Sequence, residues 1–247
     1  MLITSRQNKI LQHVRKLQQS KAYRVKSGQF VADGTKLFDE ALKWWPGLEL
    51  VIAAESVALP PLPEHIKEYR VPADLMQWLS QMEAPQGVIF VGRRPEAGDL
   101  TLEPGCLILD GIQDPGNLGT ILRTADALEV PVILSDGCAD PWSDKTVRAT
   151  MGAVFRTVPQ TADKQTIIAA CREKNIPLAV TALSDTSVDI RTADLSSCAV
   201  VIGSEGRGIC EDYARAAQQQ LIIPMNPRCE SLNAAVAATI VMWQMRR

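Results

Sequence analysis

Histidine is scarce in this sequence, and the two copies, His13 and His65, both lie in its first third. The rest of the chain therefore has no imidazole to act as a general base or to hold a metal ion. The six cysteines are scattered singly, without a C-x-x-C pair, which argues against a structural zinc site and a disulfide scaffold. Ser-His-Asp hydrolysis and zinc chemistry are thus poor interpretations, and we expect no metal. A nucleophilic role for Cys229, which lies in a polar loop, is a minor alternative.

Long apolar runs are also missing. No run reaches the roughly 18 residues that a membrane-spanning helix requires. The opening segment MLITSRQNKILQHVRK lacks the apolar region of a secretory signal. We therefore expect a soluble, cytoplasmic protein without a membrane partner.

The sequence also lacks the usual nucleotide-binding motifs. GIQDPGN has the glycine spacing of a phosphate loop, but it places Asn117 and Leu118 where Lys and Ser or Thr are required. GSEGRG has the wrong glycine spacing for a dinucleotide-binding turn. Neither a Walker-type phosphate loop nor a Rossmann dinucleotide site is expected.

Charge is nearly balanced overall, with a formal net charge of −2, but it is distributed unevenly. Residues 1–32 contain seven basic side chains and no acidic one. These basic residues are Arg6, Lys9, Arg15, Lys16, Lys21, Arg24 and Lys26. Such a stretch is either a solvated helix face or a surface that binds the phosphates of a nucleic acid.

The hydrophobic pattern divides the chain into two α/β domains with a linker between them. Residues 1–92 alternate short apolar strands with helices, and residues 93–104 are rich in proline, glycine and charge, as linkers are. In residues 105–247, apolar strands alternate with helices, which indicates a mostly parallel sheet covered on both faces.

Ligands of parallel α/β sheets bind at the carboxyl ends of the strands. Three loops expected there are chemically unusual: DGIQDPGNLGTILRTADA, IGSEGRGI and PMNPRCESLN. Asn117 is compatible with a helix N-cap. Arg123 lies on an otherwise apolar helix, where its guanidinium needs a carboxylate, a phosphate or a helix end as partner. Glu205 lies among glycines, which permit close backbone approach.

The segments DPGNLGTILRTADALEV, VIGSEGRGI and IIPMNPRCESLNAAVA resemble, in order and spacing, the three motifs of the SpoU branch of the SPOUT RNA methyltransferases. The segment QNKILQHVRKL and the following GQFVADGTKLFDEAL resemble the substrate-binding domain of the ribosomal RNA members. The resemblance implies a C-terminal α/β domain with a deep trefoil knot, an N-terminal RNA substrate-binding domain, a homodimer, and S-adenosyl-L-methionine as cofactor.

The resemblance also implies site residues. The polar set of the motifs, assigned to catalysis, corresponds to Asn117, Arg123, Glu205, Ser231 and Asn233. The cofactor contacts correspond to Thr181, Leu183, Gly203, Ile223, Met225 and Leu232. The expected RNA contacts are Arg6, Arg15, Lys16, Lys21 and Arg24. The sequence departs from the family pattern in NPRC, where a glycine is usual, in SLNAAVA, where SLNVSVA is typical, and at Asp33, where the substrate domain usually has Glu.

The implied reaction is methyl transfer to a ribose 2′-hydroxyl, with ribosomal RNA favoured as substrate. We interpret Arg123 as a phosphate clamp rather than as a base, because a guanidinium has a very high pKa. Three alternatives stay open: a transfer RNA 2′-O-methyltransferase, a methyltransferase of the base-modifying branch, and an inactive RNA-binding protein with the same fold.

Overall fold

The computed structural model describes residues 1–96, 98–182, 187–204, 206–226, 228–229 and 231–247. The chain forms two compact units. Unit 1 comprises Met1–Glu96 together with Asp140–Arg156, and unit 2 comprises Ala97–Ala139 together with Thr157–Arg247. The described part of the chain has no helix long and apolar enough to cross a membrane.

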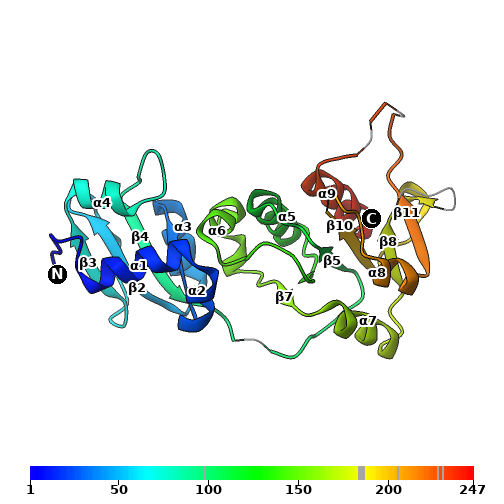
Figure 1. Ribbon diagram of the computed structural model, residues 1–247, viewed down its shortest axis with the longest axis horizontal. Coiled ribbons are helices and arrows are strands. Elements are labelled where there is room, and N and C mark those ends of the chain that lie inside the picture. Colours follow the sequence, from blue (N-terminus) through cyan, green and yellow to red (C-terminus); the bar gives the residue numbers. More distant parts are fainter. Residues whose placement is uncertain (97, 183–186, 205, 227, 230) are drawn as a thin grey trace. The chain divides into compact units, whose positions relative to one another are not determined.

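Unit 1 is built on a four-stranded sheet in the order β1-β4-β2-β3. Its strands are β1 (Gln29–Asp33), β2 (Leu48–Ala54), β3 (Lys67–Val71) and β4 (Val88–Arg93). β4 pairs antiparallel with β1 and β2, and β2 pairs parallel with β3. The helices are α1 (Lys9–Gln19), α2 (Lys21–Ser27), α3 (Thr35–Trp44) and α4 (Ala73–Leu79), as Figure 1 shows.

Side chains alternate between the two faces of this sheet, as the period of two in a strand requires. On β1, Phe30 and Ala32 join the core on one face, whereas Val31 joins the core on the other. α1 buries Leu11 and Val14 in the second core. The polar side of α1 therefore faces away from the sheet, and it carries the basic residues Lys9, Arg15 and Lys16.

The segment Asp140–Arg156 belongs to unit 1, although the sequence pattern assigned all of residues 105–247 to one domain. It contains helix α6 (Asp144–Thr150) and the 3-10 turn η1 (Ala153–Phe155). Trp142 and Phe155 are each 3% exposed and pack in the core that contains Phe30. Burial of these aromatic side chains accounts for the departure from the predicted boundary.

Unit 2 contains a seven-stranded sheet in the order β7-β6-β5-β10-β8-β11-β9, in which every pairing is parallel. The strands are β5 (Cys106–Asp110), β6 (Val132–Leu134), β7 (Gln160–Thr161), β8 (Leu178–Thr181), β9 (Val188–Asp189), β10 (Ala199–Gly203) and β11 (Gln219–Ile222). The predicted parallel α/β class is therefore correct for this unit.

Helices cover both faces of the sheet of unit 2 (Figure 1). α5 (Pro115–Ala127) and α9 (Ala234–Met245) share one core with Leu107 and Leu109 of β5. α7 (Lys164–Glu173) and α8 (Glu211–Ala216) share the other core with Cys106 and Ile108. The turn η2 (Ile190–Thr192) follows β9. Both faces of β5 are thus buried, which explains its continuous apolar sequence.

Candidate active site

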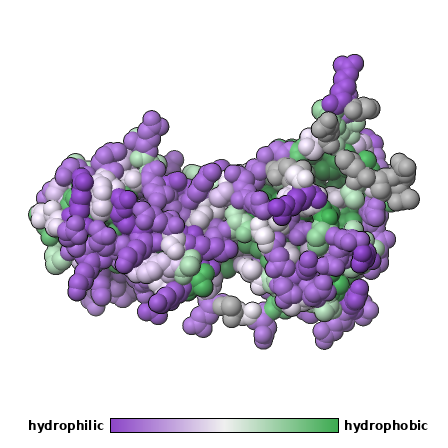
Figure 2. Space-filling view, viewed as in Figure 1, coloured by the Kyte–Doolittle hydropathy of each residue, from purple (hydrophilic) through white to green (hydrophobic). Residues whose placement is uncertain are grey.

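A pocket of about 470 Å³ lies in unit 2 where the neighbouring strands β10, β8 and β11 end. Thr181, Gly203 and Ile222 stand at the carboxyl ends of these three strands, and all three line the pocket. The segment after β11 adds Ile223, Met225, Ser231 and Leu232 to the wall. In Figure 2, apolar surface is visible in unit 2 beside the residues drawn in grey. The position agrees with the rule that parallel sheets bind ligands at their carboxyl edge.

Gly203 has no room for a side chain because the backbone of Gly208 and Ile209 packs directly against it. A Cβ atom built at this position would lie 2.2 Å from the carbonyl oxygen of Gly208 and 2.6 Å from the backbone nitrogen of Ile209. The backbone nitrogen of Gly208 donates a hydrogen bond of 2.9 Å to the carbonyl oxygen of Ser204, which closes the turn. This tight turn forms one wall of the pocket.

The pocket is predominantly apolar. Among the described lining residues, Arg207 is the single charged side chain. Hydrogen bonds to a ligand would therefore come mainly from backbone groups and from the hydroxyls of Thr181, Ser204 and Ser231. Such a lining suits an organic ligand with apolar and hydrogen-bonding parts.

Asn233 joins the starts of two helices that are distant in sequence. Its Oδ1 accepts hydrogen bonds from the backbone nitrogens of Ala235 and Val236 at 2.9 and 3.3 Å, so Asn233 is the N-cap of α9. Its Nδ2 donates to Oδ1 of Asn117 at 3.0 Å, near the start of α5. This amide pair fixes the polar end of the C-terminal segment beside α5.

Asn117 is not the N-cap of α5. Asp114 caps this helix by accepting a hydrogen bond of 2.8 Å from the backbone nitrogen of Asn117. The N-cap interpretation of Asn117 is therefore wrong, and its side chain instead contacts Asn233. The N-cap lies three residues before Asn117, and Pro115 occupies the first position of the helix, where proline is favoured.

Arg123 is exposed on α5. Its guanidinium makes no ion pair or hydrogen bond with the residues that the structure describes. The expectation that it needs a partner is thus not met within the described parts of the chain. The exposed guanidinium is solvated and is accessible to an anionic group.

Two predicted site residues, Leu183 and Glu205, lie outside the described residues. The other predicted cofactor residues, namely Thr181, Gly203, Ile223, Met225 and Leu232, all line the one pocket. Ser231 lines it as well, whereas Asn117, Arg123 and Asn233 are not among its lining residues.

Sequence reasoning missed two residues of this region. Arg207 lines the pocket, and the signal in the sequence that could have indicated it is a cation in a loop that follows a buried strand. Asp110, at the end of β5, is 8% exposed, and its Oδ2 accepts a hydrogen bond of 2.7 Å from the backbone nitrogen of Cys210. Asp110 therefore anchors the far end of the pocket turn.

The described residues contain no group of three or more His, Cys, Asp or Glu side chains that could hold a metal ion. Burial raises the pKa of the Cys106 thiol to about 12 and that of Cys171 to about 11. Both are neutral thiols at physiological pH and act as core residues. Cys229 is exposed.

The basic segment of unit 1 contains residues in two different environments. Arg6, Lys16 and Lys21 are exposed, and Arg15 is half-buried. None of these four forms an ion pair with any described carboxylate. They are free to contact an anionic partner.

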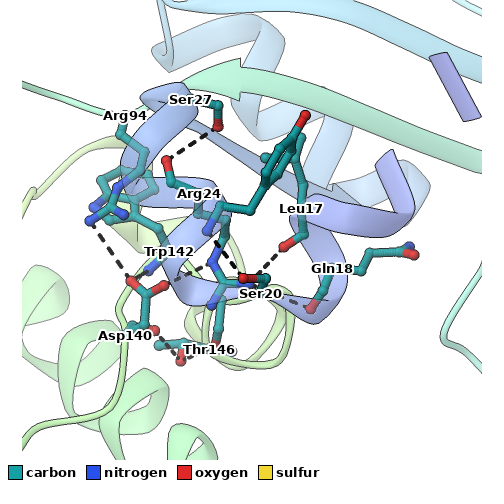
Figure 3. Close-up of polar contacts among 11 residues, drawn as sticks. Leu17, Gln18, Ser20, Arg24, Ser27, Arg94, Asp140, Trp142 and Thr146 are labelled. Atoms are coloured by element: carbon teal, nitrogen blue, oxygen red, sulfur yellow. Dashed lines mark hydrogen bonds and ion pairs between the residues drawn. The ribbon is translucent and has the colours of Figure 1, made fainter. Parts of the chain in front are cut away.

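Arg24 differs from these four, and its environment does not favour the predicted contact with RNA. Its side chain is buried, and its Nε donates to Oδ2 of Asp140 at 2.8 Å (Figure 3). One of its terminal nitrogens donates to the carbonyl oxygen of Leu17 at 2.6 Å. A guanidinium satisfied in this way inside unit 1 connects α2 to the segment that begins at Asp140 and is not available to phosphates.

The fold and the pocket define a parallel α/β protein with a ligand site at the carboxyl edge of its sheet. Residues 104–243 match the SpoU rRNA Methylase family, and residues 8–89 match the MRM3-like substrate binding domain. The chain therefore belongs to the SpoU rRNA methylase family.

Similar proteins span nearly the whole chain. The 23S rRNA (guanosine(2553)-2'-O)-methyltransferase RlmP of Bacillus subtilis is 31% identical, with 99% of this chain and 98% of the relative covered. The mitochondrial rRNA methyltransferase 3A of Danio rerio is 29% identical, with 96% of this chain and 68% of the relative covered. The structure of an AdoMet-bound rRNA methyltransferase from Sinorhizobium meliloti is 31% identical, with a TM-score of 0.88 and 100% and 97% of the two chains covered.

Proposed function

We propose that this protein transfers a methyl group from S-adenosyl-L-methionine to a ribose 2′-hydroxyl of ribosomal RNA. The observation that carries the proposal is the convergence of separated family motifs on one pocket: the end of β10, the segment after β11 and the start of α9 all contribute to its wall. The relatives named above are rRNA methyltransferases, and the one from Sinorhizobium meliloti has AdoMet bound.

The pocket fits this cofactor in size and chemistry. Its volume of about 470 Å³ lies within the usual range for small-molecule sites. Ile223, Met225 and Leu232 offer apolar contacts, and the glycine turn at Gly203 brings backbone groups close to a ligand. S-adenosyl-L-methionine supplies an activated methyl group when bound, so the protein has to align the ribose oxygen with it and accept one proton.

We assign the alignment of the RNA to Arg123. Its exposed, unpaired guanidinium is suited to bind a phosphate next to the target ribose in a bidentate manner. The hydroxyl of Ser231, which lines the pocket, is the described side chain that we propose assists the deprotonation, together with water or a phosphate of the substrate. Asn117 and Asn233 hold the loop that carries Ser231. Glu205 keeps its predicted catalytic role as a proposal from the motif alone.

We also propose that the C-terminal segment forms the trefoil knot. β11 lies next to β8 and β9, whereas α9 packs against α5 and β10. The chain after β11 therefore returns past the ends of β8 and β10, and it shares the pocket with the turn after β10. Knots are rare in proteins, and this path is the feature that supports one.

A homodimer is the expected assembly. α9 exposes Val236 and Trp243, which are 48% and 66% exposed, on a helix with no charged side chain between its first and last residues. A contiguous apolar helix face is a liability in a monomer and suits contact with a second copy of the chain. In such a dimer, Arg123 of one chain and the Ser231–Asn233 loop of the other would complete one site.

A methyl-transfer assay tests the proposed activity. The full-length protein is incubated with methyl-labelled S-adenosyl-L-methionine and unmodified transcripts of ribosomal or transfer RNA, and the RNA is digested to nucleosides. Label in a 2′-O-methylated nucleoside from ribosomal RNA is expected. Label in a methylated base would support the base-modifying branch. Label in transfer RNA would identify transfer RNA, not ribosomal RNA, as the substrate. Cofactor binding without methyl transfer would support an inactive RNA-binding protein.

A further inference from the structure

Trp78, on α4, has two arginine side chains against its indole ring. The guanidinium carbon of Arg6 is 5.4 Å from the ring centroid, and that of Arg15 is 4.6 Å from it. Guanidinium groups within about 6 Å of a ring centroid are attracted to the negative face of the ring, and tryptophan is the best partner for this contact. Arg6 precedes α1 and Arg15 lies on it, so the ring brings together two cations from different turns of the chain.

The ring itself is held firmly by the core of unit 1. Leu75 and Leu79 of the same helix are 3% and 1% exposed. Gln18 of α1 donates a hydrogen bond of 2.9 Å to the carbonyl oxygen of Leu79, and Arg15 donates one of 3.3 Å to the carbonyl oxygen of Trp78. These bonds fix the backbone of α4 to α1, and the half-buried indole packs against the same core. Arg6 is exposed and Arg15 is half-buried.

The two charges are not neutralised within the described residues. Neither Arg6 nor Arg15 forms an ion pair with a carboxylate there. Two like charges held over one ring repel each other, and an anion that contacts both would relieve this repulsion. The nearby Lys16 is held in a similar way, with its ammonium 5.8 Å from the ring centroid of Tyr23.

We propose that Trp78 is a positioning residue for RNA binding: its ring holds the guanidinium groups of Arg6 and Arg15 together so that both contact phosphates of the RNA strand. This inference rests on the proposed function, because it takes RNA as the substrate. Neither the predicted contacts nor the family motifs include Trp78, and its own atoms need not touch the RNA.

The physical benefit is preorganisation. A free arginine side chain loses rotamer freedom when it binds a phosphate, and an arginine already held against a ring loses less. Replacing Trp78 by leucine removes the ring and keeps an apolar side chain of helical preference. We expect the affinity for RNA to fall about fivefold to tenfold, which corresponds to the lower end of the ordering cost of two arginine side chains at an interface. Cofactor affinity should stay within about twofold of the wild type, since the pocket residues belong to unit 2.

The experiment uses full-length Trp78→Leu and Trp78→Phe variants, with Trp44→Leu as the matched control. Trp44 is 45% exposed and has Lys43 over its ring at 4.7 Å, but it belongs to α3 and no RNA contact is assigned to it. Affinity for an unmodified 23S ribosomal RNA transcript is measured over a range of salt concentrations, with cofactor affinity and thermal unfolding measured in parallel. Trp78→Leu should lower RNA affinity and flatten the log–log salt slope by about 1, Trp78→Phe should lie between it and the wild type, and Trp44→Leu should match the wild type.

An Arg15→Gln change in the wild type and in Trp78→Leu distinguishes positioning from a structural role. If the ring positions Arg15, this change costs less affinity when the ring is absent, because the two losses overlap. Additive losses would overturn the role of Trp78. So would an RNA affinity of Trp78→Leu within twofold of the wild type while Arg15→Gln is impaired. In both cases the proposed contact of Arg15 with RNA is unaffected. If Trp78→Leu does not fold, the effect of Arg15→Gln on RNA affinity is compared between the wild type and Trp78→Phe instead. A wild-type protein that methylates no RNA defeats the proposed function instead.

Discussion

Replacement of Gly203 by alanine is expected to narrow the proposed cofactor pocket at its glycine turn. The new Cβ would lie 2.2 Å from the carbonyl oxygen of Gly208 and 2.6 Å from the backbone nitrogen of Ile209. Carbon atoms make favourable contacts at about 3.5 Å or more, so one of the two backbone segments has to move by about 1 Å. Both obstructing atoms belong to the backbone, which cannot turn aside as a flexible side chain can.

The size of the effect follows from this overlap. Overpacking of a tight site typically costs about 1–3 kcal/mol. If the cost falls mainly on the shape of the pocket that binds S-adenosyl-L-methionine, the affinity should decrease by roughly tenfold to a hundredfold. Isothermal titration calorimetry of the full-length protein measures this directly, and thermal unfolding reports how much of the cost is global.

Gly206 provides the matched control in the same turn. A Cβ built on Gly206 meets no atom within 4 Å. Gly206→Ala should therefore bind the cofactor as the wild type does, within about twofold, by the same packing argument. Equal cofactor affinity in Gly203→Ala and Gly206→Ala would refute the assignment of this turn to the cofactor wall.

Two further predictions concern buried ionisable groups, and a third concerns the proposed dimer. Burial raises the pKa of Asp144 to about 6, above its ordinary value, so the free energy of unfolding should fall by about 2 kcal/mol as pH rises from 4 to 7. Chemical denaturation should show a flatter pH profile for Asp144→Asn. Arg24→Ala leaves the buried Asp140 with only its longer contact of 3.9 Å to Arg94 and should destabilise the protein by about 3 kcal/mol, and an unchanged melting temperature would contradict this role. Arg123→Ala and Asn233→Ala chains, each nearly inactive alone, should regain up to about one active site per mixed dimer; mixed dimers no more active than either parent would place each site within one chain.

Strands with long apolar runs were predictable from the sequence. LELVIAA forms β2 and CLILD forms β5. Short apolar runs bounded by turn residues are typical of buried strands. The strands β7 and β9 were not predicted. Each has two residues, which is too short for any periodic pattern, and each exists because a neighbouring strand offers hydrogen bonds.

Long-range partners limited what the sequence could reveal about the site. The apolar character of Trp142 and Phe155 predicts burial but does not say in which core they lie. In the same way, Arg24 and Arg6 look alike in a basic segment, and only the folded chain brings Asp140 to Arg24 across 116 positions. The pocket lining was reached through resemblance to the family, since nothing in residue spacing relates Gly203 to Leu232.

The central claim is that this protein methylates a ribose 2′-hydroxyl of ribosomal RNA. The direct measurement is a map of alkali-resistant linkages in ribosomal RNA from cells with and without the protein, because a 2′-O-methylated ribose blocks alkaline cleavage at its own linkage. We predict that one resistant linkage is lost in cells without the protein and is restored by the wild type but not by Arg123→Ala. An identical set of resistant linkages in both kinds of cell would contradict the claim.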